Sequence, residues 1–207
     1  MIQYQNLEKE SPNEPYTTQL LDVLKSHQVK ATFFVVGKNA LRFPAVLQRA
    51  VAEGHTIGSH TQSHSFRNYF FEPTLENEIA EGQYNISQVI GYEPKYFRAP
   101  WLWRTPLVLN TVRELGLKPI WGKFGSIIEV AQPSAQRVVR HALRRSRPGD
   151  ILIFHDGYNG TTASRAVTVE AINLLIPKLR SIGYSFVTIS EIEQELSTSH
   201  RSLRSLT

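Results

Sequence analysis

The sequence predicts an α/β protein built on a parallel sheet with helices outside it. Two observations carry this prediction: short apolar runs rich in β-branched and aromatic residues recur along the chain, and amphipathic helical patterns separate them. Apolar runs of this kind are typical of strands that are buried on both faces. The alternation shows no internal repeat, low-complexity segment or domain boundary, so we expect a single domain over residues 1–207.

Each predicted element follows from its local pattern. Six short apolar runs predict strands at Ala31–Gly37, Thr56–His60, Tyr96–Trp101, Pro119–Phe124, Ile151–Asp156 and Ser185–Ile189. Apolar residues at three- and four-residue spacing predict helices at Thr17–Ser26, Ala40–Glu53, Leu75–Ile90, Pro106–Leu115, Ser134–Arg145 and Val167–Arg180. A last helix is expected at the stretch SEIE, where Ser190 and Glu193 have the spacing of a capping box.

The two ends of the chain depart from this pattern. The alternation requires a strand before the first helix, but residues 1–10 are weakly apolar and then charged. Either Ile2–Asn6 forms a poor first strand or that strand is missing, and with it the strands would number seven. Residues 197–207 are polar and basic, and we expect them to form a flexible tail.

Composition excludes several classes of protein. The chain has no cysteine, so disulfides, thiolate metal sites and cysteine nucleophiles are excluded, and a transition metal would need His, Asp or Glu. No apolar run approaches the roughly 20 residues that span a bilayer, so no membrane span is expected. No leader peptide is visible, so the sequence as written indicates a cytoplasmic protein.

The net charge of +5 comes partly from an arginine cluster in RVVRHALRRSRPG, residues 137–149. A solvated helix face explains such a cluster most simply. A binding patch for an anionic polymer is the sharper alternative. Because no nucleic-acid motif accompanies the cluster, we expect no nucleic-acid partner.

Polar side chains stand at the ends of three predicted strands. His60 and His64 follow one strand, and four-residue spacing on a helical turn would let both imidazoles bind one metal ion. Arg98 ends a second strand, where a buried arginine beside a structural proline is an equally good interpretation. His155 ends a third, where a lone histidine is more often structural than catalytic. The convergence at the carboxyl ends of parallel strands favours a functional site.

In order and spacing, the stretches ATFFVVG, EGHTIGSHTQSH, FRAPW and GDILIFHDG resemble the polysaccharide deacetylases of carbohydrate esterase family 4. That family includes chitin, chitooligosaccharide and peptidoglycan N-acetylglucosamine deacetylases, and the resemblance runs from about Ser11 to about Ile192. It implies a distorted, TIM-like (β/α) barrel of seven or eight strands. It also implies metal-dependent hydrolysis of N-acetyl groups on a glycan that contains N-acetylglucosamine, with a divalent ion, usually zinc.

The resemblance assigns roles to individual residues. His60 and His64 match the metal-binding histidines, Arg98 matches the arginine that orients the base, and His155 matches the acid that protonates the leaving amine. The residues expected to contact substrate are Trp101 through its backbone N–H, Ile153 beside the acetyl methyl group, and Trp121 beside the sugar. A core role for Trp121 is equally open.

The first motif of the family, Thr-Phe-Asp-Asp-Gly-Pro, is altered here to residues 7–12, LEKESP. Lys9 stands where the catalytic base should be, and a protonated lysine cannot act as a base. Glu10 stands where the metal-binding Asp should be, and its carboxylate is an accepted zinc ligand. The resemblance begins abruptly, so we expect a truncated or replaced N-terminus. A longer parent would carry the missing strand and an export signal, which would make the protein secreted or part of the cell envelope.

The aspartate that supports the acid histidine in the family is also absent between Trp121 and Ser126. Asp150 lies about 16 Å from His155 along an extended strand, and Asp156 points to the opposite face by alternation. Either a subfamily manages without this carboxylate or Glu129 replaces it.

Three hypotheses remain at this point. The first is a metal-dependent deacetylase of N-acetylated glycans. The second is a catalytically inactive relative that still binds carbohydrate through Trp101, Trp103 and Trp121. The third is a binder of an anionic polymer, for which steeply salt-dependent binding without metal would be the sign.

Overall fold

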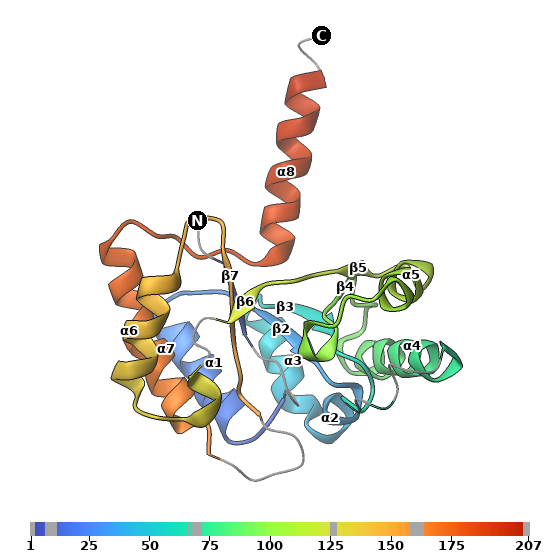
Figure 1. The fold of residues 1–207 in the computed structure, drawn as a ribbon, viewed down its shortest axis with the longest axis horizontal. Coiled ribbons are helices and arrows are strands. Elements are labelled where there is room, and N and C mark those ends of the chain that lie inside the picture. The colour runs from blue at the N-terminus through green and yellow to red at the C-terminus, as the bar shows by residue number, and fades with distance from the viewer. Residues whose placement is uncertain are drawn as a thin grey trace.

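The computed structural model describes residues 3–6, 12–65, 67, 72–124, 128–157 and 164–204. Over these ranges, parallel strands form one sheet in the order β5-β4-β3-β2-β1-β7-β6, and helices surround it (Figure 1). The strands are β1 (Gln3–Asn6), β2 (Thr32–Val35), β3 (Thr56–Ser59), β4 (Tyr96–Phe97), β5 (Lys118–Pro119), β6 (Lys123–Phe124) and β7 (Ile151–Phe154). The helices are α1 (Tyr16–Ser26), α2 (Gly37–Arg42), α3 (Pro44–Ala52), α4 (Glu72–Ile90), α5 (Pro106–Glu114), α6 (Ala135–Arg145), α7 (Ala166–Ser181) and α8 (Ile189–Arg204).

A first strand is present. Gln3–Asn6 pairs in parallel with β2 on one side and with β7 on the other. This is the place that the β-α alternation requires for it, so the alternative in which the chain lacks its first strand is wrong. The N-terminal residues thus form a strand despite their weak apolar character, because both neighbouring strands offer backbone partners.

The predicted strand Pro119–Phe124 is instead two short strands at opposite ends of the sheet. Lys118–Pro119 pairs with β4, and Lys123–Phe124 pairs with β7. A flat sheet of this size would hold its outer strands about 29 Å apart, but residues 120–122 can span at most about 14 Å between them. The sheet must therefore curl until its two edges approach each other, which gives the predicted distorted barrel.

The predicted last strand, Ser185–Ile189, is reduced to an isolated β-bridge at Phe186, and α8 begins at Ile189. The capping box is also two residues earlier than predicted. The Thr188 backbone N–H donates to the Glu191 carboxylate at 2.6 Å, and the Glu191 N–H donates to the Thr188 hydroxyl oxygen at 3.3 Å. The stretches TISE (residues 188–191) and SEIE (residues 190–193) both match the capping-box pattern, so the sequence alone could not decide which of them begins the helix. From this cap α8 projects away from the barrel to Arg204 (Figure 1).

The predicted helix Ala40–Glu53 is broken into α2 and α3. Phe43 has φ −128° and ψ 54°, outside the helical region, and Pro44 begins α3 at its first position. Proline has no N–H to continue the α2 hydrogen bonds, but it fits the first turn of a new helix.

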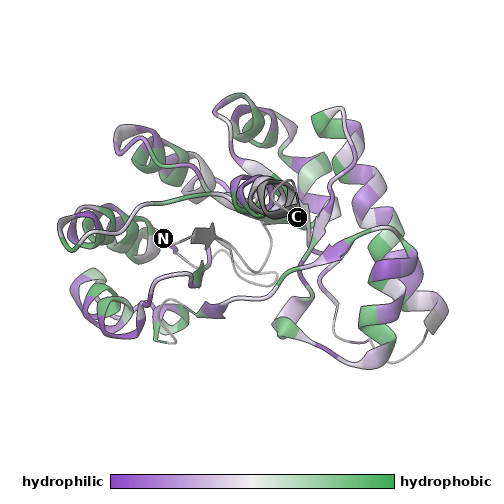
Figure 2. Cartoon of the chain, turned by 90° about the horizontal axis from the view of Figure 1, so that it is seen from above, coloured by the Kyte–Doolittle hydropathy of each residue, from purple (hydrophilic) through white to green (hydrophobic). Residues whose placement is uncertain are grey.

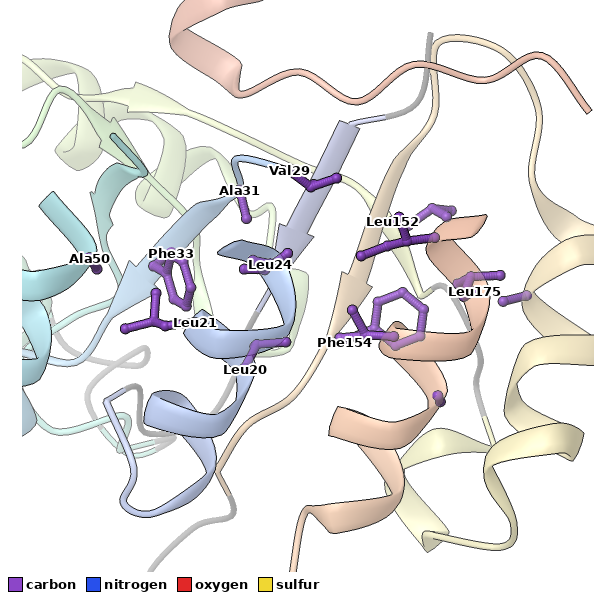
Figure 3. Close-up of a cluster of buried hydrophobic side chains, with 14 of the residues drawn as sticks. Leu20, Leu21, Leu24, Val29, Ala31, Phe33, Ala50, Leu152, Phe154 and Leu175 are labelled. Carbon is purple, nitrogen blue, oxygen red and sulfur yellow. The ribbon is translucent and has the colours of Figure 1, made fainter. Parts of the chain in front are cut away.

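The main core lies between the sheet and the surrounding helices. Leu20, Leu21 and Leu24 of α1 face Phe33 of β2 and Leu152 and Phe154 of β7 (Figure 3). Seen from above, helices ring the strands, and α8 is viewed along its axis (Figure 2). Within the described ranges, no helix combines the length and apolar character that crossing a bilayer requires.

His55 links this core to the amino end of β3 and makes stability depend on pH. Its Nδ1 accepts the Ala31 N–H at 3.0 Å, which requires the neutral ring. Burial, only partly offset by nearby Glu53 and reinforced by Lys30 and Arg49, lowers its pKa to about 4. Because the native state resists protonation, the stabilisation is complete above the unfolded pKa near 6.5 and is lost as pH falls toward 4. We expect the free energy of unfolding to fall on the order of 3 kcal/mol across this window.

Urea unfolding between pH 7 and pH 4 measures this effect. The substitution His55→Gln keeps an acceptor for the Ala31 N–H and should remove most of the pH dependence. His27→Gln, which changes a histidine that contacts Asn173 at the surface, is the matched control and should leave the dependence unchanged. An unchanged pH profile in His55→Gln would show that the dependence arises elsewhere.

Candidate active site

Three polar residues follow directly on three parallel strands. His60 comes after β3, Arg98 after β4 and His155 after β7. Ladder hydrogen bonds continue at two of these points: the His60 N–H donates to the Val35 carbonyl at 2.8 Å, and the Arg98 N–H donates to the Ser59 carbonyl at 3.0 Å. These bonds fix the backbone at the carboxyl end of the sheet, so the side chains gather there as the sequence predicts.

His60 has the tautomer that a metal ligand needs. It is fully buried, and its Nδ1 donates to the Arg98 carbonyl at 2.5 Å. That bond leaves the Nε2 lone pair available, and Nε2 has no hydrogen-bond partner among the described residues. Burial, followed by the electrostatic influence of His64, keeps the pKa of His60 well below its ordinary value, although the hydrogen bond to the Arg98 carbonyl acts in the opposite direction. The ring is therefore neutral at pH 7.

His64 lies beside His60, but not on the helical turn that its spacing predicts. Residues 61–64 form a loop in which Thr61 and His64 both have positive φ, 69° and 55°. The His64 N–H donates to the Thr61 hydroxyl oxygen at 3.1 Å, and the two imidazole centroids are 5.0 Å apart. The loop thus brings the two rings together by a different local geometry.

Helix α4 holds this loop through residues that the sequence analysis did not single out. The Glu78 carboxylate accepts the Ser63 N–H at 2.9 Å and the Ser63 hydroxyl at 2.7 Å. Gly82 lies so close to the loop that an added Cβ would be 2.6 Å from the Thr61 carbonyl carbon. A glycine inside a regular helical pattern was the available signal for this close approach.

We expect Gly82→Ala to weaken catalysis and folding together. A Cβ at this position would meet the backbone of Thr61 and Gln62, so the loop must move and His64 with it. Overpacking of this kind costs about 1–3 kcal/mol, although alanine gains about 1 kcal/mol over glycine in a helix. Gln88→Ala, an exposed position on the same helix, is the control, and kcat/KM with thermal unfolding is the measurement. A more stable, fully active Gly82→Ala protein would disprove the contact.

Arg98 and Trp101 complete this side of the site. The fully buried Arg98 guanidinium lies over the Phe34 ring, 4.2 Å from its centroid. Trp101 has φ 54°, which is rare for a residue with a side chain, and its ring lies 4.5 Å from that of His64. Strained backbone of this kind concentrates at functional sites. It orients the Trp101 backbone and places its ring beside that of His64.

Glu129 supports His155, as one of the two sequence alternatives predicted. The 3-10 helix η3 (Glu129–Ala131) places this carboxylate, which is fully buried, 2.7 Å from His155 Nδ1. Asp156 does not support His155, because its carboxylate accepts a hydrogen bond from the Thr17 hydroxyl instead. Asp150 forms an ion pair with Lys123. The Nδ1–H of His155 therefore donates to Glu129, and Nε2 is left for chemistry.

The surroundings keep Glu129 ionised. Burial alone would raise its pKa, but His155, the hydroxyl of Thr168 and the Arg165 guanidinium, whose Nη1 is 3.7 Å away, outweigh burial. The pKa of Glu129 consequently lies below its ordinary value. An ionised carboxylate at Nδ1 stabilises the protonated imidazole that a general acid requires.

Ile153 and Trp121, which the sequence predicts to contact the substrate, differ in how deeply they are buried. Ile153 is fully buried in β7, two residues before His155. Its neighbours Leu152 and Phe154 pack toward the helices, so Ile153 faces the barrel interior with His155 by alternation. Trp121 is half-buried in the connection between β5 and β6. Within the part of the chain that is described, Trp121 makes no ring contact with His60, His64 or His155.

The donors present fit a divalent cation. His60 and His64 are adjacent buried imidazoles, and the first has its Nε2 oriented by an outer hydrogen bond, as in metal sites generally. No group of three His, Cys, Asp or Glu side chains comes together over the described residues. Glu10, the predicted third ligand, falls outside those residues together with Lys9, so both assignments stay predictions.

Comparisons with known proteins point to one family. Residues 8–120 match the model of the family described as polysaccharide deacetylase. A peptidoglycan-N-acetylglucosamine deacetylase of Bacillus cereus is 33% identical over 184 residues, which cover 88% of this chain and 84% of that protein. A chitooligosaccharide deacetylase of Bradyrhizobium is 32% identical over 191 residues, which cover 88% of this chain and 87% of that protein.

A solved structure extends the agreement to three dimensions. A family 4 acetyl xylan esterase from Clostridium thermocellum, in complex with a cobalt ion, superposes with a TM-score of 0.81. The two chains are 30% identical, and the match covers 92% of this chain and 89% of the other. The similarity confirms both the resemblance inferred from the sequence motifs and the distorted barrel.

Proposed function

Since the chain belongs to the polysaccharide deacetylase family, we propose that it hydrolyses N-acetyl groups on glycans that contain N-acetylglucosamine, with zinc as the divalent ion. One observation carries the proposal. Two adjacent imidazoles and a carboxylate-supported histidine meet at the carboxyl end of one sheet, and His60 already has the tautomer of a ligand. Metal-assisted amide hydrolysis needs both parts.

His60 and His64 would hold the ion, with Glu10 as the expected third ligand. When bound, the ion lowers the pKa of a water molecule and polarises the acetamide carbonyl. The role of this chain is to fix the ligands: Arg98 holds the His60 ring by its carbonyl, and the α4 contacts hold the loop that carries His64.

The proton that reaches the leaving amine comes from His155. Water adds its oxygen to the acetyl carbon and releases a proton to solvent, since Lys9 cannot accept it while charged. The C–N bond then breaks to leave acetate, the amine nitrogen takes a proton from His155 Nε2, and solvent returns a proton to His155. Glu129 keeps the imidazole in the tautomer and orientation for this transfer through the 2.7 Å bond to Nδ1. The backbone N–H of Trp101, set by its left-handed conformation, is the proposed donor to the developing oxyanion.

The substrate class follows from the named relatives and from the residues available to bind a sugar. Relatives of this chain are named for peptidoglycan N-acetylglucosamine and for chitooligosaccharide. Ile153 would line the space for the acetyl methyl group, and Trp101 and Trp121 offer rings for sugar contact. Action on assembled peptidoglycan would place the protein outside the cytoplasmic membrane, in line with the secreted or envelope location that the resemblance implies.

An inactive carbohydrate-binding relative is the second candidate. It is favoured by Lys9, which stands where the family has its catalytic base and cannot accept a proton while charged. In that case the glycan would still bind at Trp101 and the histidine pair, but no acetate would be released.

Acetate release distinguishes the two candidates. The purified chain would be incubated with N-acetylated chitooligosaccharide and with peptidoglycan, with zinc, with cobalt, and with a chelator. Metal-dependent release of acetate supports the deacetylase. Glycan binding by a folded protein with no acetate release under any condition would exclude it and support the inactive relative. If Lys9→Asp then creates activity, the missing base is the reason.

A further inference from the structure

A groove of about 440 Å³ runs between α6 and α7 on the outside of the barrel. Its floor is made by Val139, Leu143 and Leu174, and its rim by Arg140, Arg144 and Lys178. In Figure 1 these helices lie on the flank opposite α5. The groove is separate from the strand ends that carry His60 and His155, so the proposed deacetylation does not use it.

The cations around this groove are exposed and have no acidic partners. Helix α6, with the sequence AQRVVRHALRR, contains no acidic residue. Arg137, Arg140, Arg144 and Arg145 are exposed along it, and within the described residues none of them forms an ion pair. The acidic residue of α7 is Glu170, which stands about 12 Å along the helix from Lys178. The rim therefore carries uncompensated positive charge.

The floor of the groove is apolar and remains partly accessible. Leu143 and Leu174 are only partly buried, although both pack against the main core. Polyanions such as nucleic acids need cations and stacking rings, but none of the residues that line the groove is aromatic. An apolar floor between cationic walls matches a molecule with a negative head and an apolar tail.

We propose that the α6–α7 groove binds the acidic phospholipids of a membrane surface, with the lipid phosphate on Arg140, Arg144 and Lys178 and part of an acyl chain on Leu143 and Leu174. The choice of an acidic phospholipid rests on charge complementarity, since each basic residue near an anionic bilayer strengthens the binding of the protein to that bilayer. The apolar floor selects a lipid over a soluble polyanion. Such docking would hold the barrel at the membrane by its flank and leave the carboxyl ends of the strands open.

Vesicle binding tests this proposal with the whole chain. Co-sedimentation would be measured with vesicles of phosphatidylcholine alone and of equal parts phosphatidylcholine and phosphatidylglycerol, at low and high salt. We expect binding only to the acidic vesicles, and weaker binding at high salt. The double variant Arg140→Gln/Arg144→Gln should weaken binding roughly 30-fold, because the loss of each charge should weaken it about fivefold and the two factors multiply. The matched control Arg104→Gln/Arg113→Gln removes two exposed charges near α5 and should bind as the unmodified chain does.

The apolar part of the groove needs its own measurement. Leu143→Gln/Leu174→Gln should bind acidic vesicles several-fold more weakly with the salt dependence unchanged, provided that thermal unfolding shows a folded protein. Hydrogen exchange on the unmodified chain is a second readout, and vesicles should protect α6 and α7. No binding to acidic vesicles, or protection that omits these helices, overturns the proposal. Binding to polyphosphate that is as tight as to vesicles, and indifferent to the leucine variant, would assign the groove to a soluble polyanion instead.

Discussion

His60→Ala is expected to reduce kcat/KM for deacetylation by a thousandfold or more and to weaken zinc binding in parallel. The reason is that His60 is buried, neutral and hydrogen-bonded through Nδ1, which leaves its Nε2 lone pair to bind the metal ion. Losing a ligand removes the ion's contribution to charge stabilisation, which is worth several kcal/mol, and each 1.36 kcal/mol corresponds to about a factor of ten in rate. Acetate release and calorimetric zinc titration are the measurements.

The matched control is His27→Ala, which removes a surface histidine bonded to Asn173. It should leave both activity and zinc affinity unchanged. Zinc titration also reads the site without catalysis, so the test holds even if the unmodified chain releases no acetate. Unchanged zinc affinity in a folded His60→Ala protein would mean that the ion is held elsewhere.

Glu129→Gln is expected to lower kcat by about 10²–10⁴-fold, the range that general acid catalysis contributes, with little change in KM. Glutamine keeps the size of the side chain but removes the charge that stabilises a protonated His155, and it allows the wrong imidazole tautomer. The low pKa of Glu129 means that this charge is present throughout the neutral range. Steady-state kinetics over a range of pH would measure the change in kcat and in its pH profile.

The control for this variant is Glu114→Gln, which changes an exposed carboxylate at the end of α5. Thr168→Val removes one of the hydrogen bonds to Glu129 and should have a smaller effect in the same direction. If Glu129→Gln kept both the rate and the pH profile of the unmodified protein, the contact with His155 would be structural only. That outcome would favour the other alternative from the sequence, in which a subfamily of these proteins lacks a carboxylate that supports the acid histidine.

Much of the site was readable from the sequence because its residues follow strand ends. His60, Arg98 and His155 each come directly after an apolar run, and parallel strands bring such positions to one edge. The alternation also predicted correctly that Asp156 points away from His155. Glu129 could be offered only as an alternative, since it lies before α6 in a connection where no helix or strand periodicity fixes the direction of a side chain.

The failures have a common physical origin in backbone geometry that no periodicity encodes. The loop of His64 depends on residues with positive φ and on the close approach of Gly82, and neither belongs to a helix or strand repeat. Pro119–Phe124 reads as one strand because apolar and aromatic residues continue through it. Its division into β5 and β6 is imposed by pairing with β4 and β7. Tertiary partners decide such short elements, and local propensity does not.

The position of β1 has a consequence for the order of folding. Gln3 is paired with Ile151, so β1 must wait for a partner strand that follows it by 148 residues in the sequence. The side chain of Asn13 likewise donates to the carbonyl of Asp156 across 143 residues. Until β7 has been synthesised, β1 can pair only with β2, and its other edge has no partner strand. We therefore expect the barrel to be completed last at β1 and β7, and to fold slowly, because these contacts join parts of the chain that are 148 residues apart.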